Sequence, residues 1–314
     1  MSIAQRLADS ALINPGSDRV RSVAGLARRS ARSRAGRFLA EGPQCVREAL
    51  RAHLGEFDAL VPAPRDGVID ALYITERALQ RHPDIDQLVK RVLQAEGSPR
   101  VFVRMVSDEV LAAMSDAEHP QGVLAVCRIP ELTWAQVAER RPRLVAVMCR
   151  VQDPGNAGTV LRAADAAGAD AVVLTAGSVD LHNPKVVRST AGSLFHLPVL
   201  TGLDPAELVG RPVSDAAGGE LQVLAADGYG ALELDELQDA SAAGREAAVE
   251  LARPTAWLFG NEAQGLSEQE KALASHRVAV PLHGAAESLN VGTAATLCLY
   301  ASARAQRRTA EGAA

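Results

Sequence analysis

The chain contains 314 residues, of which 47% are hydrophobic and 23% are charged, a composition typical of a globular protein long enough for two domains. Aromatic residues make up only 3%, which argues against binding of single-stranded nucleic acid by base stacking on an aromatic platform. The net charge of −5 excludes a surface that is basic throughout.

The first part of the chain, 1–130, alternates between helical and strand-like patterns, which predicts a small α/β domain. The expected elements are a basic helix at 22–37, a strand at 38–42, an amphipathic helix at 44–53 and strands at 71–75, 100–106 and 122–129. Seven arginines and no acidic residue lie between Arg19 and Arg37. This stretch is a candidate phosphate-binding surface, although a solvated helix face would have the same composition.

A polar segment bracketed by prolines, 131–142, is the expected linker to a second domain at 143–314. Beyond it, short apolar runs separated by helical patterns predict a mostly parallel sheet that is covered by helices on both faces. These runs occupy 144–151, 171–175, 196–200, 221–226, 256–259 and 277–280. The stretches 204–219 and 233–253 are expected to be surface helices or loops.

The four cysteines are far apart and form no CxxC pair, and the seven histidines show no metal-ligand spacing. No secretory leader is recognised, and the apolar run at 289–303 is too short and too rich in Ala and Thr to cross a bilayer. We therefore expect a protein of the reducing cytoplasm with no metal site and no membrane anchor.

The first of three polar strand-to-helix junctions lies at 153–162. Ala157, Val160 and Leu161 share the apolar face of the expected helix, whereas Arg162 projects almost opposite to it. Burial in the core therefore does not explain Arg162. The glycines of this junction match neither a dinucleotide fingerprint nor a P-loop, and an exposed arginine after an ordinary turn is the alternative interpretation.

The second junction, 257–267, ends a buried strand with Gly260-Asn261-Glu262 and passes through Gly265 to a helix. Ser267 is expected to cap this helix, with Glu270 at the capping-box position. Two glycines around a carboxylate allow a flat ligand to approach the backbone closely. In isolation, a plain strand–turn–helix connection would look the same.

The third junction, 285–294, leads from a strand-like run at 277–282 to an almost wholly apolar helix. Ser288 and Asn290 lie at the start of that helix, where short polar side chains and unpaired N–H groups can contact a ligand. One of the two is expected to cap the helix. A helix that is apolar on every side must be buried on every side.

In this order, the three junctions resemble the signature motifs of the SpoU/TrmH-type 2′-O-ribose RNA methyltransferases of the SPOUT superfamily. The matching features are the Asn156-to-Arg162 spacing, the loop Gly-Asn-Glu262-x-x-Gly265-Leu266 and the run Ser288-Leu-Asn-Val291. Residues 183–195 resemble the substrate-facing segment of that family. Residues 38–42 with their arginine-rich lead resemble a ribosomal-protein-like substrate-binding domain.

The resemblance implies a C-terminal α/β domain with a deep trefoil knot, S-adenosylmethionine as cofactor, RNA as substrate and a homodimer formed through the final helix. The implied catalytic residues are Arg162, Asn156, Glu262, Ser288 and Asn290. The implied cofactor-binding residues are Phe259, Gly260, Asn261, Glu262, Gly265, Val280, Leu282, Ser288, Leu289 and Asn290. The implied RNA contacts are Arg28, Arg29, Arg32, Arg34 and Arg188.

A guanidinium stays protonated, so our hypothesis is that Arg162 orients a phosphate and stabilises a developing alkoxide rather than acting as a general base. Asn156 and Glu262 would hold the arginine or the loops, and Ser288 and Asn290 would position the ribose and the cofactor. The N-terminal domain favours 23S ribosomal RNA as the substrate. Transfer RNA methylation and a non-catalytic RNA-binding or ribosome-assembly role are the alternatives, whereas a dehydrogenase would need a GxGxxG fingerprint that is missing.

Overall fold

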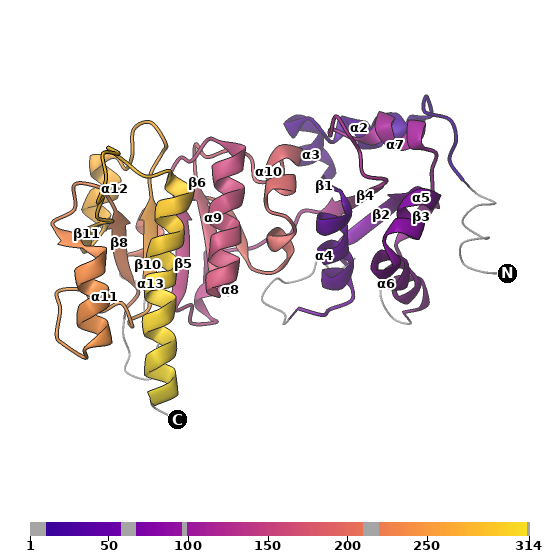
Figure 1. Cartoon of the computed structure of the whole chain (residues 1–314). Coiled ribbons are helices and arrows are strands. Elements are labelled where there is room, and N and C mark those ends of the chain that lie inside the picture. The colour runs from indigo at the N-terminus through magenta and orange to yellow at the C-terminus, as the bar shows by residue number, and fades with distance from the viewer. Residues whose placement is uncertain (1–10, 58–66, 96–98, 210–219, 313–314) are drawn as a thin grey trace. The chain divides into compact units, whose positions relative to one another are not determined.

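The computed structural model describes residues 11–57, 67–95, 99–209 and 220–312, without the side chains of 309–312. The chain forms two compact units, each with its own sheet (Figure 1). Unit 1 contains Met1–Glu131 and Asp180–His196, and unit 2 contains Leu132–Val179 and Leu197–Ala314.

Unit 1 is built on a four-stranded mixed sheet in the order β1-β4-β2-β3. Strands β1 and β2 each pair antiparallel with β4, and β2 pairs parallel with β3. All four strands overlap the stretches expected from the sequence. Their bounds are Arg37–Glu41 for β1, Ile69–Ile74 for β2, Phe102–Met105 for β3 and Val123–Arg128 for β4.

Helices cover both faces of this sheet. Val23 of α2 and Met114 of α7 pack with the strand residues Leu39, Ala71 and Val126 in one core cluster. Helix α4 contacts the sheet and α6, while α10 contacts β1. The helices of unit 1 are α2 (Asp18–Gly25), α3 (Arg29–Ala35), α4 (Pro43–His53), α5 (Glu76–Arg81), α6 (Pro83–Gln94), α7 (Asp108–Met114), α10 (Pro184–Ser189) and the 3-10 turn η1 (Ser193–Phe195).

The expectation of one basic helix at 22–37 is wrong. The chain forms α2, breaks, and forms α3 before it enters β1 at Arg37. The break follows from packing, because Leu26 at the end of α2 is buried in the core beneath that helix. Gly36 adopts a left-handed conformation with φ of 60° and ends α3.

Unit 2 is built on a seven-stranded sheet in the order β7-β6-β5-β10-β8-β11-β9, and every neighbouring pair is parallel. This confirms the parallel α/β sheet expected from the sequence. The strands are β5 (Leu144–Met148), β6 (Ala171–Thr175), β7 (Val199–Leu203), β8 (Gln222–Ala226), β9 (Leu232–Glu233), β10 (Thr255–Phe259) and β11 (His276–Ala279).

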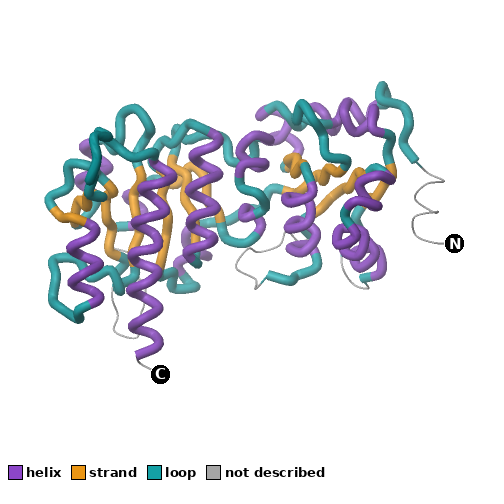
Figure 2. Tube along the Cα trace, in the orientation of Figure 1, coloured by secondary structure: helices purple, strands orange, loops and turns teal. Residues whose placement is uncertain are grey.

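Side chains alternate between two covered faces of this sheet. Val145 and Val147 of β5 pack in a core cluster with Trp134 of α8 (Trp134–Ala138) and Leu208 of η2 (Pro205–Leu208). On the opposite face, Trp257 of β10 donates a hydrogen bond to Ser302 of α13 (Val291–Gly312). Figure 2 shows α13 side by side with α9 (Pro154–Ala167) over the strands. Strands buried on both faces are apolar throughout, which is why their runs are recognisable in the sequence.

The remaining elements of unit 2 are α8 (Trp134–Ala138), α9 (Pro154–Ala167), η2 (Pro205–Leu208), α11 (Leu234–Ala242), α12 (Glu268–Leu273) and α13 (Val291–Gly312). Among the described residues, no helix is both long enough and apolar enough to cross a membrane. Part of the stretch expected at 204–219 lies outside the described residues, since 210–219 are not described.

Two segments pack differently from a simple division of the chain near residue 130. Residues 132–138 were expected in a linker, but Trp134 and Val137 are buried in the core of unit 2. Asp180–His196 follows β6 of unit 2 in the chain and yet packs in unit 1. Within unit 1, Asp180 of this segment forms an ion pair with Arg32. The ring centroids of Phe38 and His182 lie 4.7 Å apart.

Candidate active site

The three polar junctions of unit 2 follow the carboxyl ends of β5, β10 and β11, and these ends share one edge of the parallel sheet. At the first junction, the carboxylate of Asp153 accepts a hydrogen bond of 2.8 Å from the backbone N–H of Asn156 and caps α9. Pro154 occupies the first turn, where a missing N–H costs nothing. This cap places Asn156 in the first turn of the helix.

The second junction is a tight closed loop. The backbone groups of Asn261 and Gly265 exchange hydrogen bonds of 3.1 and 2.8 Å. A Cβ atom at Gly260 would lie 2.3 Å from the carbonyl carbon of Gly265, and Gly265 itself has φ of 63°. Both glycines are therefore required by the loop, and Phe259 ends β10 fully buried just before it.

Glu262 projects from this loop to the first junction. Its Oε1 accepts hydrogen bonds of 3.1 Å from the backbone N–H of Asp153 and from Nδ2 of Asn156, and its Oε2 accepts one of 3.2 Å from the backbone N–H of Gln152. Burial by itself would raise the pKa of Glu262, but its own backbone N–H and these donors outweigh burial and lower that pKa below its usual range. The carboxylate is ionised at neutral pH.

Asn156 joins all three junctions. Its Nδ2 donates to Glu262, and its Oδ1 accepts a hydrogen bond of 2.8 Å from Nδ2 of Asn290. Asn290 in turn accepts a hydrogen bond of 2.9 Å from the backbone N–H of Gly292 and caps α13. A Cβ atom at Gly292 would lie 2.7 Å from Cγ2 of Thr159, so the start of α13 is packed directly against α9.

Arg150, which the sequence analysis did not single out, stabilises the second junction through side-chain and backbone contacts. Its guanidinium pairs with Glu270 through two contacts of 3.0 and 2.7 Å and also donates to the carbonyl of Gly265. The Arg150 carbonyl accepts a hydrogen bond of 2.8 Å from Nδ2 of Asn261. The Ser267–Glu270 capping box was visible in the sequence, but nothing local indicates an ion-pair partner 120 residues away.

Arg162 lies in α9, two turns beyond its first residues, and is exposed. Within the described part of the chain, its guanidinium has no ion-pair or hydrogen-bond partner. The neighbouring Leu161 and Ala163 are buried, as the predicted apolar face requires. A cation without an internal partner is available to a substrate phosphate or to a developing negative charge.

The backbone between β11 and α13 can hold a ligand. No residue of 281–289 forms a backbone hydrogen bond with another described residue, and most of this segment is exposed. Ser288 is exposed there, Leu282 is 40% exposed, and Leu289 and Val280 are half-buried. Unpaired backbone donors and acceptors beside apolar side chains fit the adenine and the amino-acid part of S-adenosylmethionine.

The five arginines expected to contact RNA fall into two groups. Arg28, Arg29 and Arg34 are exposed. The expectation that Arg32 contacts RNA is corrected by its burial, because it is 3% exposed and its guanidinium donates to the carbonyls of Leu26 and Ala27 as well as to Asp180.

Arg188 is also engaged within unit 1. Its guanidinium pairs with the carboxylates of Glu41 and Asp116, and Glu41 is buried. Because two carboxylates already pair with its guanidinium, Arg188 is less available to an RNA phosphate than Arg28, Arg29 and Arg34 are. In the described part of the chain, no group of three or more His, Cys, Asp or Glu residues could hold a metal ion.

Comparison with known protein families identifies the class of protein that this fold and these junctions define. The sequence model of the SpoU rRNA Methylase family matches residues 143–300, and that of the MRM3-like substrate binding domain matches residues 17–125. The chain belongs to the SpoU rRNA methylase family.

Two relatives whose names state the reaction that they catalyse align with more than half of the chain. RlmP of Bacillus subtilis, a 23S rRNA (guanosine(2553)-2′-O)-methyltransferase, is 37% identical over 196 residues, which cover 62% of this chain and 70% of that protein. A 23S rRNA (uridine(2479)-2′-O)-methyltransferase of Streptomyces viridochromogenes is 31% identical over 64% of this chain and 67% of its own. The crystal structure of the SpoU methyltransferase AviRb from the same organism, in complex with AdoMet, superimposes with a TM-score of 0.71 at 28% identity and covers 93% of this chain and 99% of that one.

Proposed function

We propose that this protein methylates a ribose 2′-hydroxyl of ribosomal RNA, with 23S rRNA as the substrate and S-adenosylmethionine as the methyl donor. The observation that carries the proposal is the Asn156 link, which brings the residues of all three motifs to one edge of the sheet. The relatives named as 23S rRNA 2′-O-methyltransferases and the AdoMet-bound structure support both the reaction and the cofactor.

The residues of the site divide into a reacting group and a supporting group. When bound, S-adenosylmethionine supplies a methyl group on a positively charged sulfur. Arg162 orients the RNA phosphate and stabilises the negative charge that develops on the 2′-oxygen. Glu262 is no general base, because hydrogen-bond donors already engage its carboxylate and lower its pKa. Asn156, Glu262 and Asn290 hold the three loops, and exposed Ser288 contacts the cofactor or the ribose.

The activity is tested with purified protein, S-adenosylmethionine carrying a labelled methyl group, and 23S rRNA from cells that lack the gene. We expect label at one position of the RNA, with the adjacent phosphodiester resistant to alkaline hydrolysis. Transfer RNA from the same cells is the parallel substrate, and methylation of transfer RNA alone would establish that alternative. Binding of both RNA and cofactor without methyl transfer would instead support the non-catalytic role.

The exposed arginines of unit 1 provide the RNA contact in this proposal. Arg28, Arg29 and Arg34 have no carboxylate partner among the described residues, so their charges are available to phosphates. The match of residues 17–125 to a substrate binding domain supports this assignment. The cytoplasmic location predicted from the sequence is part of this proposal, and the likeness to SpoU structures supports the predicted knot.

We propose that a second copy of the chain covers the outer face of α13. This helix is not buried on every side within one chain, because Leu297 is 43% exposed and Tyr300 is 48% exposed, with exposed Thr293 and Arg304 on the same stripe. Large apolar side chains exposed in a row indicate a contact surface, and the family resemblance points to a homodimer.

Tyr300→Glu is expected to weaken dimerisation by at least about tenfold, because burying an unpaired carboxylate at an interface costs more than about 1.4 kcal/mol. Molar mass by light scattering across a dilution series measures the effect. Ala272→Glu places the same charge at an exposed position of α12 and is the matched control. A wild-type protein that is monomeric at micromolar concentration would contradict the dimer.

A further inference from the structure

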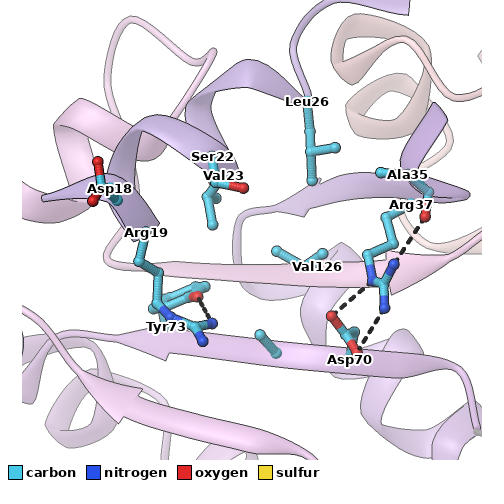
Figure 3. A pocket seen from close by; sticks show the side chains of 11 residues that line it. Asp18, Arg19, Ser22, Val23, Leu26, Ala35, Arg37, Asp70, Tyr73 and Val126 are labelled. Atoms are coloured by element: carbon cyan, nitrogen blue, oxygen red, sulfur yellow. Dashed lines mark hydrogen bonds and ion pairs between the residues drawn. The ribbon is translucent and has the colours of Figure 1, made fainter. Parts of the chain in front are cut away.

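Unit 1 contains a cavity of about 480 Å³ between α2 and its sheet, and methyl transfer as described above does not use it (Figure 3). Val23 of α2, Ala71 of β2 and Val126 of β4 give it an apolar lining. Ser22 is exposed and also lines it. The volume lies in the range of about 300–1,000 Å³ that is typical of small-molecule sites.

Polar groups stand at two ends of this cavity, with Arg19 at one and Arg37 with Asp70 at the other (Figure 3). Arg19 is held in place, since its Nη1 donates a hydrogen bond of 3.2 Å to the hydroxyl of Tyr73 and its guanidinium lies 4.1 Å from the ring centroid of Phe102. It is nevertheless exposed. A planar cation whose position is fixed in this way can stack on a flat aromatic ligand at little entropic cost.

The other end presents donors and an acceptor together. Nε of Arg37 lies 2.8 Å from one carboxylate oxygen of Asp70, and Arg128 lies 2.6 Å from the other. Arg37 also donates to the carbonyl of Ala35, so both groups have internal partners, but their side chains remain 38% and 31% exposed and a ligand can share their hydrogen bonds. This end can hydrogen-bond a polar edge that contains both donors and acceptors.

We propose that this cavity receives one unpaired nucleobase of the RNA substrate. A nucleobase has flat apolar faces and a polar edge, which match the apolar lining, the Arg19 guanidinium and the Arg37–Asp70 end. RNA-binding proteins read single-stranded nucleotides in this manner, by stacking and by hydrogen bonds to the base edges.

The position of the basic residues supports RNA as the source of the base. Arg28, Arg29 and Arg34 are exposed in the stretch between Leu26 and Ala35, and both of those end residues line the cavity. Phosphates bound by these arginines would bring the adjoining base to the cavity. The inference rests on the proposed function, because it assumes that unit 1 binds the RNA.

Two matched pairs of variants test the proposal, with the affinity for 23S rRNA from cells lacking the gene as the readout. Ser22→Trp fills the cavity and is expected to raise the dissociation constant by about ten- to a hundredfold, the loss that corresponds to one stacked base. Gln80→Trp adds the same side chain at an exposed position of α5, which does not line the cavity and lies outside the arginine-rich stretch, and should change the constant by less than about twofold.

The second pair separates base binding from charge. Arg29→Ala removes a phosphate contact and should reduce the salt slope of RNA affinity by about 0.7–0.9, with little change in the affinity extrapolated to 1 M salt. Arg19→Ala removes a base contact and should instead weaken the affinity extrapolated to 1 M salt, with a smaller change in the slope. Because the Arg19 side chain is exposed, its replacement should not prevent folding. The Arg19→Ala and Arg29→Ala pair therefore tests the proposal even if Ser22→Trp fails to fold.

Equal affinities within the first pair, together with equal affinities at 1 M salt within the second pair, would overturn the cavity as a base site. That result, obtained with a wild-type protein that methylates 23S rRNA, would leave the proposed function intact. A wild-type protein that bound the RNA at the cavity without methylating it would have the opposite meaning, because the base site would stand and the enzymatic proposal would fall.

Discussion

Replacing Arg162 by alanine is expected to lower kcat for RNA methylation by about 10²–10³-fold, the loss typical of removing one group that stabilises charge in the transition state. Arg162 is exposed and has no partner among the described residues, so the folded structure does not depend on it. S-adenosylmethionine binding and thermal stability should therefore stay at the wild-type level. Arg162→Lys keeps the charge without the planar fork and should recover part of the rate.

The matched control is Arg140→Ala, which removes an exposed arginine from the same unit. Arg140 lies in the segment between α8 and β5, outside the three junctions. Single-turnover rates with saturating RNA and cofactor separate the chemical step from binding. Wild-type turnover by Arg162→Ala, with cofactor binding unchanged, would remove Arg162 from the mechanism.

Asn156→Asp is expected to lower kcat/KM by about 10²-fold at neutral pH, because displacements of about 1 Å at a site of this kind have effects of that size. The substitution preserves the shape of the side chain but removes the donor to Glu262, which lies 3.1 Å away. Two carboxylates would then face each other, and their repulsion would separate the first junction from the second. Both the rate and the dissociation constant of the cofactor should report this separation.

The same variant makes a prediction about pH. Each carboxylate raises the pKa of its neighbour, so one of them takes up a proton as the pH is lowered from neutrality. The protonated carboxyl group then donates the hydrogen bond that Asn156 donates in the wild type, and activity relative to wild type should increase. Asn156→Ala cannot recover in this way and is the control. A parallel pH profile for the two variants would show that the hydrogen bond to Glu262 does not hold the site.

Much of the architecture was predictable because its causes are local. The strands of unit 2 are buried on both faces, so their apolar runs mark the parallel sheet directly, and the Ser267–Glu270 capping box marks the start of α12. The same local reasoning failed at 22–37, where helical composition continues but the burial of Leu26 divides the helix. A composition rule cannot detect a packing contact with a distant strand.

The arginine predictions show the same limit in the candidate site. Charge clustering placed Arg32 on an RNA surface and the family resemblance placed Arg188 there, whereas carboxylates 148 and 147 residues away in the chain accept their hydrogen bonds. In the other direction, Arg150 has no motif of its own, and its role becomes visible only through its contacts with Glu270 and Gly265. Net charge and spacing therefore identify candidate residues without showing which of them are free.

By itself, the sequence determined the parallel α/β sheet, the polar junctions after β5, β10 and β11, and the family to which they belong. Those features depend on hydrophobic period, glycine positions and capping residues, all of which act within a few neighbours along the chain. Only the tertiary structure decided that Asn156 joins Glu262 and Asn290, which lie 106 and 134 residues away in the sequence. It also decided which arginines are free and where unit 1 leaves a cavity, since these depend on how distant elements pack.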